Sequence, residues 1–458
     1  MAVGLWLYDL LAMFRAPGFH QGMSKKKMLQ EIPFLKGEGL SGGFRYFDAS
    51  MQDDVLVLET LRAASTAGAA VANYVEALSP MWDGSRISGF RVKDHEDLSG
   101  KSEFEIKAHR SVICVGPWLD QLGIRMSAQW GKWITPSKGV HLVFDLKRIP
   151  IKGALVMTHP EDGRIAFVIP REDLGEGVAI VGTTDGPTGL DPDQAEVTSK
   201  EVDYLMGLLN RYFPDLKLTV EDIVSAYVGV RPLMNASREG SQKNKKGAAE
   251  SSSVLQKVSR EHHIDEGPGG TVLVAGGKYT THRKMAGEIV DRVLEIWQRD
   301  SEKDPAILFP KNLGAPQVDS PLNPEISVKE LAQVSEQSQR DGLTIPKSIL
   351  MRFGKIALEW AQARQNSKDQ LSDSLFLKER LDYSIQYEMA LHLEDFYFRR
   401  CSLFMTRKDH GLSFAKDLAE VLLKDTGQDL ARVDSEVQRL NAEVQHRDSW
   451  RKSAALRK

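Results

Sequence analysis

Apolar and polar residues alternate along this chain with two periods, one typical of strands and one typical of helices. Residues 271–275 form a β-branched apolar run, which predicts a short buried strand. Gly276 and Gly277 interrupt the run, and from Met285 the apolar residues recur at helical spacing as far as Trp297. The pattern therefore predicts a strand, a glycine turn and a helix.

This turn has two interpretations. Backbone N–H groups gather at a helix N-terminus, for which Thr280 or Thr281 is the expected N-cap, and they favour negative charge. Glycines let a flat ligand approach the backbone closely, and Lys278 adds a full positive charge. The alternative is an ordinary strand-to-helix connection with a solvated lysine.

A second junction of the same kind comes earlier in the chain. Residues 111–115 predict a buried strand that ends at Gly116 and Pro117, and a helix is expected to begin near Trp118. Two such junctions in one α/β chain favour a cofactor crevice at the carboxyl ends of the strands.

The strand period dominates residues 80–110, just before the earlier junction, and much of the region between the two junctions. Residues 80–110 alternate between polar and apolar, and turn signals at 83–84 and 99–100 predict a small antiparallel meander. A mixed or antiparallel sheet is predicted from five further segments: 139–144, 153–157, 164–169, 177–182 and 222–231.

Three local features complete this α/β part. An apolar stripe predicts a helix from Asp53 to Val75, and Ser199 is the expected N-cap of a helix over 199–213. Pro232 is expected to end the last strand, which would leave Arg231 at a strand end facing a cleft.

The last third of the chain has a different character. Residues 300–325 contain five prolines and no period, which predicts a linker over 306–325. Beyond it, five segments have helical spacing and predict an all-α domain over 326–447: 328–340, 347–363, 378–391, 394–405 and 413–445.

Three other segments are each open to a functional and a structural interpretation. Residues 1–14 predict an apolar helix, either on a membrane surface or buried against the domain, and we expect burial. Residues 37–42 match G-x-G-x-x-G, but Pro33 breaks the segment before them and an extended segment follows, so we interpret them as a loop. Residues 236–256 predict a solvated loop rather than a polyanion-binding patch.

Composition narrows the class of protein. The chain has 458 residues, 41% of them hydrophobic and 27% charged, which is typical of a soluble protein of two or three domains. The formal net charge of −3 implies no general affinity for nucleic acid. Cys114 and Cys401 offer neither a disulfide framework nor a cysteine metal site, so a reducing, cytoplasmic compartment is expected.

Polar residues that follow or flank the apolar strands are the candidates for a site: His141, Thr183, Thr184, Asp185, Arg231, Arg260 and Lys278. A histidine can accept a proton at neutral pH, and arginine forks suit a carboxylate or a phosphate. Each also has a structural explanation, as a core histidine, a buried ion pair or a helix cap. No metal site is predicted, because adjacent His262 and His263 diverge in a strand. The residues alone favour a cofactor enzyme that acts on a small anion.

Several ordered motifs resemble those of FAD-dependent glycerol-3-phosphate dehydrogenases, the aerobic, quinone-linked type within the D-amino-acid-oxidase-like flavoprotein superfamily. The motifs are Ser137-Lys-Gly-Val-His141, Val181-Gly-Thr-Thr-Asp185, Tyr227-Val-Gly-Val-Arg-Pro-Leu233, Ser259-Arg-Glu-His262 and Gly276-Gly-Lys-Tyr-Thr-Thr281. Residues 112–118 are similar to the family's flavin-domain strand, with Cys114 and Val115 replacing Ala-Thr, and residues 387–400 are similar to the signature of its helical domain. The resemblance runs nearly end to end.

The resemblance implies a fold and a set of domains. Residues 1–305 would be an oxidoreductase domain, with Rossmann-like FAD-binding parts at 1–80, 105–130 and 255–300. A mixed or antiparallel substrate sheet would be built from 80–105 and 135–240. The linker at 306–325 and the helical domain would follow.

The resemblance also implies roles for individual residues. Substrate and catalytic positions would be His141, Thr183, Asp185, Arg231 and Arg260, with His141 as base for the C2 hydroxyl and the arginines on the phosphate. Cofactor positions would be Gly116, Trp118, Gly276, Gly277, Lys278 and Thr280. Hydride would pass from C2 of glycerol 3-phosphate to FAD, giving dihydroxyacetone phosphate, and a membrane quinone would reoxidise the flavin. Peripheral attachment to the inner face of the cytoplasmic membrane and a homodimer are also expected.

One departure from the family bears on activity. Family members begin with a strand and a true G-x-G-x-x-G that holds the ADP pyrophosphate, and Met1 matches the family's interior instead. We therefore expect a truncated fragment or a misassigned start codon. Two alternatives follow: a non-catalytic chain without FAD that binds a partner or small anion, or a flavoenzyme for another small substrate, such as an amine or a hydroxy acid.

Overall fold

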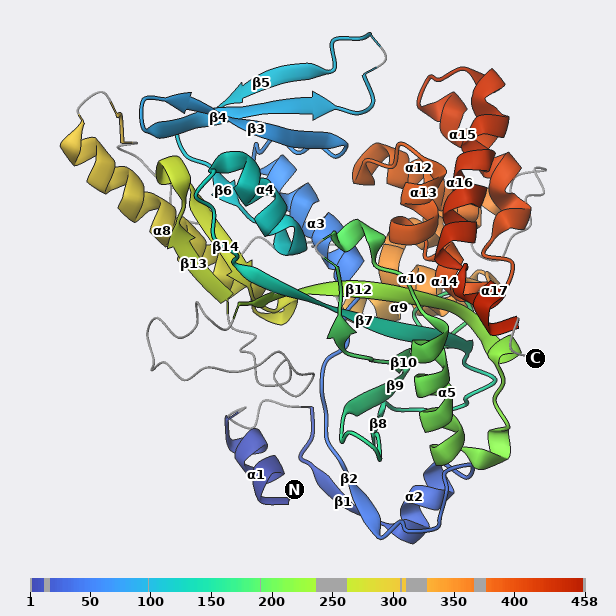
Figure 1. Cartoon of the computed structure of the whole chain (residues 1–458). Helices are drawn as coiled ribbons and strands as arrows, with labels where there is room; N and C mark the ends of the chain where they lie inside the picture. Colours follow the sequence, from blue (N-terminus) through green and yellow to red (C-terminus); the bar gives the residue numbers. More distant parts are fainter. Residues whose placement is uncertain are drawn as a thin grey trace.

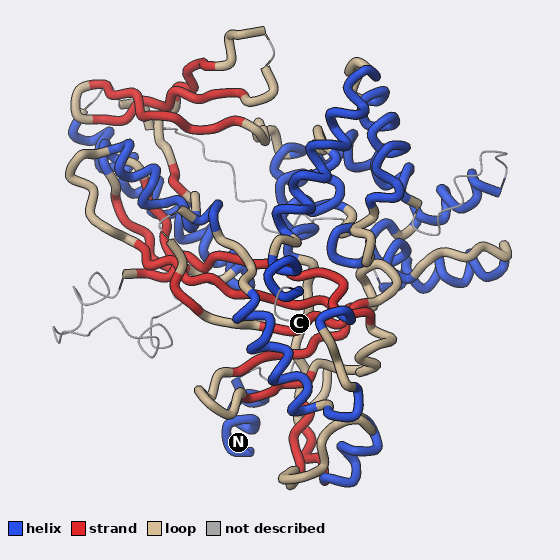
Figure 2. The backbone as a smooth tube through the Cα atoms, turned by 45° about the vertical axis from the view of Figure 1, so that its right-hand side comes forward, coloured by secondary structure: helices blue, strands red, loops and turns tan. Residues whose placement is uncertain are grey.

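The computed structural model describes residues 2–11, 17–97, 99–189, 191–235, 262–304, 307–309, 328–365 and 376–455. In these ranges helices and strands are mixed up to residue 303, and helices alone follow (Figures 1 and 2). This confirms the predicted fold class, an α/β part with a second sheet followed by an all-α part. Arg260, the predicted loop at 236–256 and most of the predicted linker lie outside the described residues.

A small three-stranded sheet carries both predicted glycine junctions. β6 (Val112–Ile113) pairs in parallel with β14 (Val272–Gly276), and β13 (His262–Glu266) pairs with β14 on its other side, antiparallel. Helices α4 (Leu119–Met126) and α8 (His282–Lys303) follow the two parallel strands. Because parallel strands end at the same edge of a sheet, both glycine turns lie at one edge.

A larger antiparallel sheet is built around β7 (Ile134–Asp145), the long strand at the centre of Figure 1. One edge of β7 pairs with β10 and β11, and the other edge pairs with β12 along the whole length of β7 up to Phe144. The other strands are β8 (Leu155–Thr158), β9 (Ile165–Arg171), β10 (Val178–Gly182), β11 (Gly186–Pro187) and β12 (Ile223–Met234). The predicted strands are therefore present and antiparallel.

One face of this sheet is packed into the main core. Val140, Leu142 and Phe144 alternate along β7, are fully buried, and belong to the same apolar cluster as residues of α5 (Ser199–Tyr212). The N-cap of α5 is Thr198, not the predicted Ser199, because a capping box joins Thr198 to Glu201 and leaves the next residue inside the helix.

The prediction that Pro232 ends its strand is wrong. β12 continues to Met234, with Pro232 opposite Pro136. β12 pairs with β7 on one side only among the described strands, and an edge strand tolerates a proline because its missing N–H is not needed there. Arg231 therefore lies within the strand and not at its end.

The predicted meander is confirmed as β3 (Val75–Asp83), β4 (Arg86–Asp94) and β5 (Glu103–Lys107), which pair antiparallel in that order. The preceding helix, α3 (Asp53–Thr66), is shorter than predicted. Gly68 adopts a φ of +96° just after it, a left-handed conformation that ends helices, so residues up to 75 are not helical.

The N-terminal segments are α1 (Ala2–Leu11), β1 (Gln21–Ser24), α2 (Lys25–Glu31) and β2 (Gly42–Arg45). Residues 37–42 connect α2 to β2, so their interpretation as a loop is confirmed. The expected burial of the first helix is wrong, because Trp6, Leu10 and Leu11 are exposed. Among the side chains of α1 that the structure describes, Asp9 is the buried one, and its Oδ2 lies 2.7 Å from Nδ1 of His20.

The C-terminal helices form a block beside the sheets (Figures 1 and 2). They are α9 (Val328–Arg340), α10 (Lys347–Phe353), α11 (Lys355–Gln365), α12 (Leu377–Glu388), α13 (Leu393–Asp395), the π-helical turn η7 (Phe396–Arg400), α14 (Leu403–Thr406), α15 (Ala415–Asp425), α16 (Val433–Arg447) and α17 (Trp450–Ala455). The predicted segments 347–363 and 413–445 are each divided, at Gly354 and Gly427, both of which have positive φ.

A buried histidine joins the two parts. His392, 3% exposed, lies between Glu96 of the loop after β4 and Glu436 of α16, with Nε2 and Nδ1 3.0 and 3.3 Å from their carboxylates. Burial alone would lower the pKa of His392, but hydrogen bonds to Glu436 and Glu96 outweigh it and hold the pKa above its usual range. Tyr74 reinforces the junction by donating to Asp395 at 2.9 Å.

Stability should therefore depend on pH through His392. A raised pKa stabilises the folded chain fully below the usual histidine pKa, and the contribution is lost as the pH rises through the raised value. We expect His392→Gln to lower the free energy of unfolding by about 3 kcal/mol near pH 6, where it breaks a buried charged pair. The deficit should shrink at alkaline pH in urea unfolding curves. His95→Gln, at an exposed pair with Glu76, is the control. An equal deficit at both pH values would contradict this account.

Candidate active site

One face of the β7–β12 pair carries two of the predicted catalytic residues, His141 and Arg231. Side chains of every second residue in a strand share a face. The register pairs Ser137 with Arg231, Gly139 with Gly229, and His141 with Tyr227. These six residues therefore form two adjacent rows on the face opposite the main core.

His141 is held between its two neighbouring strands. Its imidazole stacks on the ring of Tyr227, with centroids 4.9 Å apart and planes 10° apart. On the other side Gly182 of β10 is its register partner, and a Cβ at Gly182 would lie 2.1 Å from Cδ2 of His141. A residue without a side chain is therefore required beside the imidazole.

This setting keeps His141 uncharged. Burial lowers the pKa of His141 to about 4, and the positive charge of Arg231 acts in the same direction. Within the part of the chain that the structure describes, its buried Nδ1 has no hydrogen-bond partner. His141 is therefore neutral at ordinary pH and able to accept a proton.

Arg231 is fixed by the turn that follows β10. Its Nη2 donates to Oγ1 of Thr183 at 2.9 Å, and its Nη1 donates to Oδ1 of Asp185 at 3.4 Å. Gly139 makes room for the guanidinium, since a Cβ there would lie 2.3 Å from Nη2. Asp185 also accepts a short hydrogen bond from Ser137, which ties the turn to β7.

Open space remains between His141 and Arg231. Gly229 lies between Tyr227 and Arg231 on this face, is exposed, and a Cβ built on it would meet no atom within 4 Å. A small ligand above Gly229 would have a neutral imidazole at one end and a guanidinium at the other. That combination suits a small anion with a dissociable proton.

The predicted cofactor residues form a second group on the small sheet. Gly116, Gly276 and Gly277 all have positive φ, at +55°, +67° and +96°, and open space faces Gly116. Lys278 and Thr280 are exposed beside them. Met285 packs against the side of Gly277, so the bare backbone of this edge is at Gly116 and the solvent-facing ammonium group is that of Lys278. A flat, electron-rich ligand can approach both.

The predicted N-cap of α8 is at the right residue, but its side chain makes no capping hydrogen bond. Thr281 occupies the N-cap, yet its hydroxyl donates to the carbonyl of Lys278 and no side chain caps the helix. The first N–H groups of α8 therefore lack a side-chain partner from Thr281.

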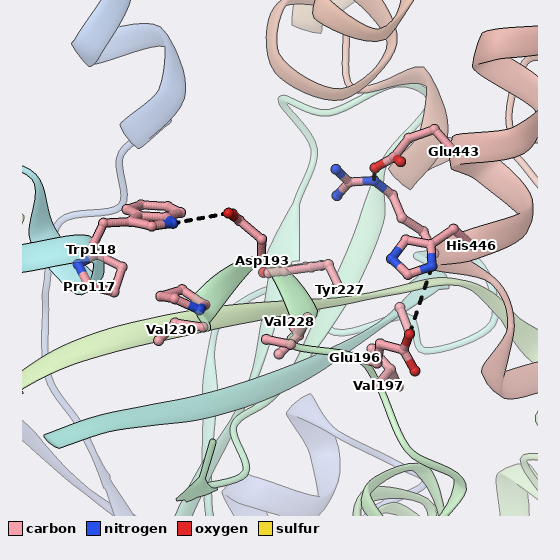
Figure 3. A pocket seen from close by; sticks show the side chains of 14 residues that line it. Pro117, Trp118, Asp193, Glu196, Val197, Tyr227, Val228, Val230, Glu443 and His446 are labelled. Atoms are coloured by element: carbon pink, nitrogen blue, oxygen red, sulfur yellow. Dashed lines mark hydrogen bonds and ion pairs between the residues drawn. The ribbon is translucent and has the colours of Figure 1, made fainter. Parts of the chain in front are cut away.

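Trp118 also borders a cavity. It lies in the turn η1 (Gly116–Trp118), and its Nε1 donates to Asp193 at 3.2 Å. The cavity of about 380 Å³ extends from Trp118 past Val228 and Val230 to His446 on α16 (Figure 3). Val228 and Val230 lie on the opposite face of β12 from Gly229 and Arg231, and Tyr227 also borders this cavity.

Sequence analysis missed four residues of the face: Tyr227 and Gly182 beside the imidazole, and Gly139 and Ser137 beside the guanidinium. The strand period could have indicated two of them. Tyr227 precedes Arg231 by four residues and Gly139 precedes His141 by two, and even spacing in a strand places residues on one face. Arg260 cannot be placed with them, since it lies outside the described residues.

The described residues contain no group of three or more His, Cys, Asp or Glu side chains that could hold a metal ion. Within the same ranges, no helix combines the length and apolar character needed to cross a membrane.

Comparison with known proteins identifies relatives of both parts. A family model described as FAD dependent oxidoreductase matches residues 7–287, and one described as the C-terminal domain of alpha-glycerophosphate oxidase matches residues 330–433. The chain is 30% identical over 410 residues to an aerobic glycerol-3-phosphate dehydrogenase of Bacillus subtilis (strain 168), covering 87% of this chain and 69% of the relative.

Two more similarities agree with this. An alpha-glycerophosphate oxidase of Streptococcus pyogenes serotype M18 is 30% identical over 458 residues, covering 89% of this chain and 72% of the relative. The solved glycerol-3-phosphate dehydrogenase from Bacillus halodurans, complexed with FAD, shares the fold with a TM-score of 0.72 at 24% identity. That alignment covers 93% of this chain and 79% of the other.

The close approach of Gly182 to His141 gives a direct test of the site's geometry. Gly182→Ala should displace the imidazole and lower the free energy of unfolding by about 1–3 kcal/mol, as overpacking does. Gly153→Ala, where a Cβ would meet no atom within 4 Å, is the matched control and should change it by less than about 0.5 kcal/mol. Urea unfolding gives the energies, and NMR of isotope-labelled histidine reports on His141. An unmoved His141 signal in Gly182→Ala would contradict the geometry.

Proposed function

The chain belongs to the family of FAD-dependent oxidoreductases, and we propose that it oxidises sn-glycerol 3-phosphate to dihydroxyacetone phosphate with FAD as the electron acceptor. The B. subtilis and S. pyogenes relatives are named for this substrate, and the second family model is named for the same chemistry. FAD dependence follows from the family, and the substrate is our proposal.

The single observation that carries the proposal is the pairing of His141 and Arg231 on one face around open space. The oxidation removes a hydride from C2 and a proton from the C2 hydroxyl. Arg231 would bind the phosphate through its guanidinium, and neutral His141 would accept the hydroxyl proton. Because a guanidinium binds a phosphate and repels a protonated amine, Arg231 favours this substrate over an amine.

Thr183 and Asp185 would act on Arg231. Both already accept hydrogen bonds from it, which keeps the fork over Gly139 before any ligand arrives. A fork that is already oriented loses less side-chain entropy on binding. Arg260, which the resemblance places on the phosphate, would supply the second guanidinium.

The residues at the glycine turns fit FAD. Two positive-φ glycine turns lie at one sheet edge, open space at Gly116 permits close approach by a flat ring, and Lys278 is exposed there. Gly276, Gly277, Lys278 and Thr280, together with Gly116 and Trp118, would hold it. When bound, FAD supplies a two-electron acceptor for the hydride, and a cation near its ring favours the added negative charge.

We also propose a quinone as the final acceptor, with the protein at the inner face of the cytoplasmic membrane as a homodimer. The exposed apolar side chains of α1, which include Trp6, Leu10 and Leu11, support contact with a membrane surface. The relatives' names include both dehydrogenase and oxidase, so the acceptor needs its own test. Quinone reduction without hydrogen peroxide would support the quinone, and peroxide formation would exclude it.

The decisive experiment is anaerobic reduction of the flavin in the full chain, purified and then supplied with FAD. Glycerol 3-phosphate should bleach the flavin absorbance, whereas sarcosine and lactate should not. A folded chain that stays colourless would overturn the proposal in favour of a non-catalytic binding protein. Bleaching by sarcosine or lactate alone would indicate another substrate.

Loss of the imidazole should slow the chemical step. We expect His141→Gln to lower kcat by roughly a hundredfold or more, the usual contribution of a general base, with little change in KM. Dye-linked turnover with glycerol 3-phosphate measures both constants. His263→Gln, on β13 and half-exposed, is the control and should match the parent. A His141→Gln enzyme with parental kcat would exclude His141 as the base.

Arg231 should matter only for substrates that carry a phosphate. Removing a charge-assisted hydrogen bond costs about 1.5–3 kcal/mol, so Arg231→Met should lower kcat/KM for glycerol 3-phosphate roughly 10–100-fold. Turnover of glycerol, which has no phosphate, should be unaffected. Arg125→Met, at an exposed pair with Glu76, is the control. Equal losses with both substrates would show that Arg231 acts on the fold and not on the phosphate.

A further inference from the structure

Among the described residues, Tyr227 is the one side chain in ring-to-ring contact with His141, and no role has so far been given to it. We propose that Tyr227 is a positioning residue whose ring, and not its hydroxyl, holds the imidazole of His141 in one orientation and shields it from water. This inference rests on the proposed function of His141 as proton acceptor.

The first support is that residues of both neighbouring strands flank the imidazole. His141 sits in the central strand of three, and its register partners are Tyr227 on one side and Gly182 on the other. The near-parallel rings, 10° apart, exclude water from one imidazole face. With no hydrogen bond to Nδ1 among the described residues, ring packing is what is left to orient the imidazole.

The second support concerns the hydroxyl. Burial raises the pKa of Tyr227 to about 12, and the nearby carboxylate of Asp53 adds to the effect. The phenol therefore keeps its proton at any physiological pH and cannot itself serve as a base. The observed contact of Tyr227 with the site is the stack of its aromatic ring on His141.

The third support is the way the ring is backed. Tyr227 packs against a small core cluster of Val143, Val178 and Ile180, and Met405 of α14 packs against the same cluster. Two residues earlier in β12, the hydroxyl of Ser225 donates to the carbonyl of Met405 at 3.1 Å. The helical domain thus braces β12 beside Tyr227, on the face that carries the site.

Several charged groups act on this pair and must be kept constant in a test. Tyr227 is influenced by Asp53 and Asp54 at the start of α3 and by Arg171 of β9, whereas His141 is influenced by Arg231. Substitutions confined to Tyr227 leave all four groups in place. Any change in the titration of His141 is then attributable to the ring.

The chain provides a matched control. Tyr204 of α5 stacks on His159 with centroids 4.0 Å and planes 10° apart, which is the same kind of pair on a different histidine. Tyr204→Ala removes an equivalent ring stack and should reproduce any general loss of stability. It should leave His141 unchanged.

The experiment follows His141 by NMR of isotope-labelled histidine in the full chain, without FAD or substrate, in Tyr227→Phe, Tyr227→Ala and Tyr204→Ala. The His141 signal is identified by its loss in His141→Gln. Because the lost ring re-exposes the imidazole to water, Tyr227→Ala should raise its titration midpoint by about one pH unit or more. Tyr227→Phe and Tyr204→Ala should leave the midpoint where it is.

Kinetics of the FAD-loaded enzyme supply a second readout. A misplaced base affects the chemical step, so kcat should fall roughly tenfold in Tyr227→Ala with KM nearly unchanged, and Tyr227→Phe should match the parent. Two results would overturn the inference: an unmoved midpoint in Tyr227→Ala, or equal losses in the phenylalanine and alanine variants. If Tyr227→Ala does not fold, Tyr227→Leu replaces it with the same expectations.

This test is independent of the proposed function. If the parent enzyme does not oxidise glycerol 3-phosphate, the proposed function fails, while the NMR midpoints still decide whether the ring controls His141. If the parent is active and the midpoints do not move, only the role of Tyr227 fails.

Discussion

The register between β7 and β12 is the constraint on which the site depends. It places His141 opposite Tyr227 and Ser137 opposite Arg231, and it turns Val140, Leu142 and Phe144 toward the core. A slip of one residue would exchange the two faces and bury the guanidinium among apolar side chains. Because burial of an unpaired charge is so unfavourable, the same packing that stabilises the core also fixes the alignment of the site.

Within that register, glycines have two different effects on the face: some permit close packing, and one leaves open space. Gly182 and Gly139 accommodate the imidazole and the guanidinium, which lie too close for any Cβ. Gly229 leaves its own position empty. The two functional side chains also differ in charge. Arg231 is positive and is compensated by Asp185, whereas burial keeps His141 neutral. A bound anion can therefore pair with Arg231 beside the proton acceptor His141, and the neutral imidazole does not form an ion pair with it.

Much of this was predictable from sequence, and the failures have physical causes. The strands, the meander, the glycine turns and the helical C-terminal part follow from period and turn chemistry. Of the predicted catalytic residues, His141 and Arg231 lie on one face, and Thr183 and Asp185 are hydrogen-bonded to Arg231. The period of apolar residues predicts strands but not their order in the sheet. That β12 has an edge unpaired among the described strands, which tolerates Pro232, could therefore not be predicted. The partners of His141 come from strands 41 and 86 residues away, which only the register reveals. Asp9 as the buried residue of α1 depends on a tertiary partner, His20.

The helical domain has a part in the site although it contributes no residue that faces the open space. Its α14 is hydrogen-bonded to β12 at Ser225, and its α13 and α16 hold the meander through His392. These contacts lie on different sheets, so the domain acts as a brace across the α/β part. An edge strand with one paired side would otherwise be free to twist, and His141 would lose the ring behind it. The position of the proton acceptor therefore depends on packing from both parts of the chain.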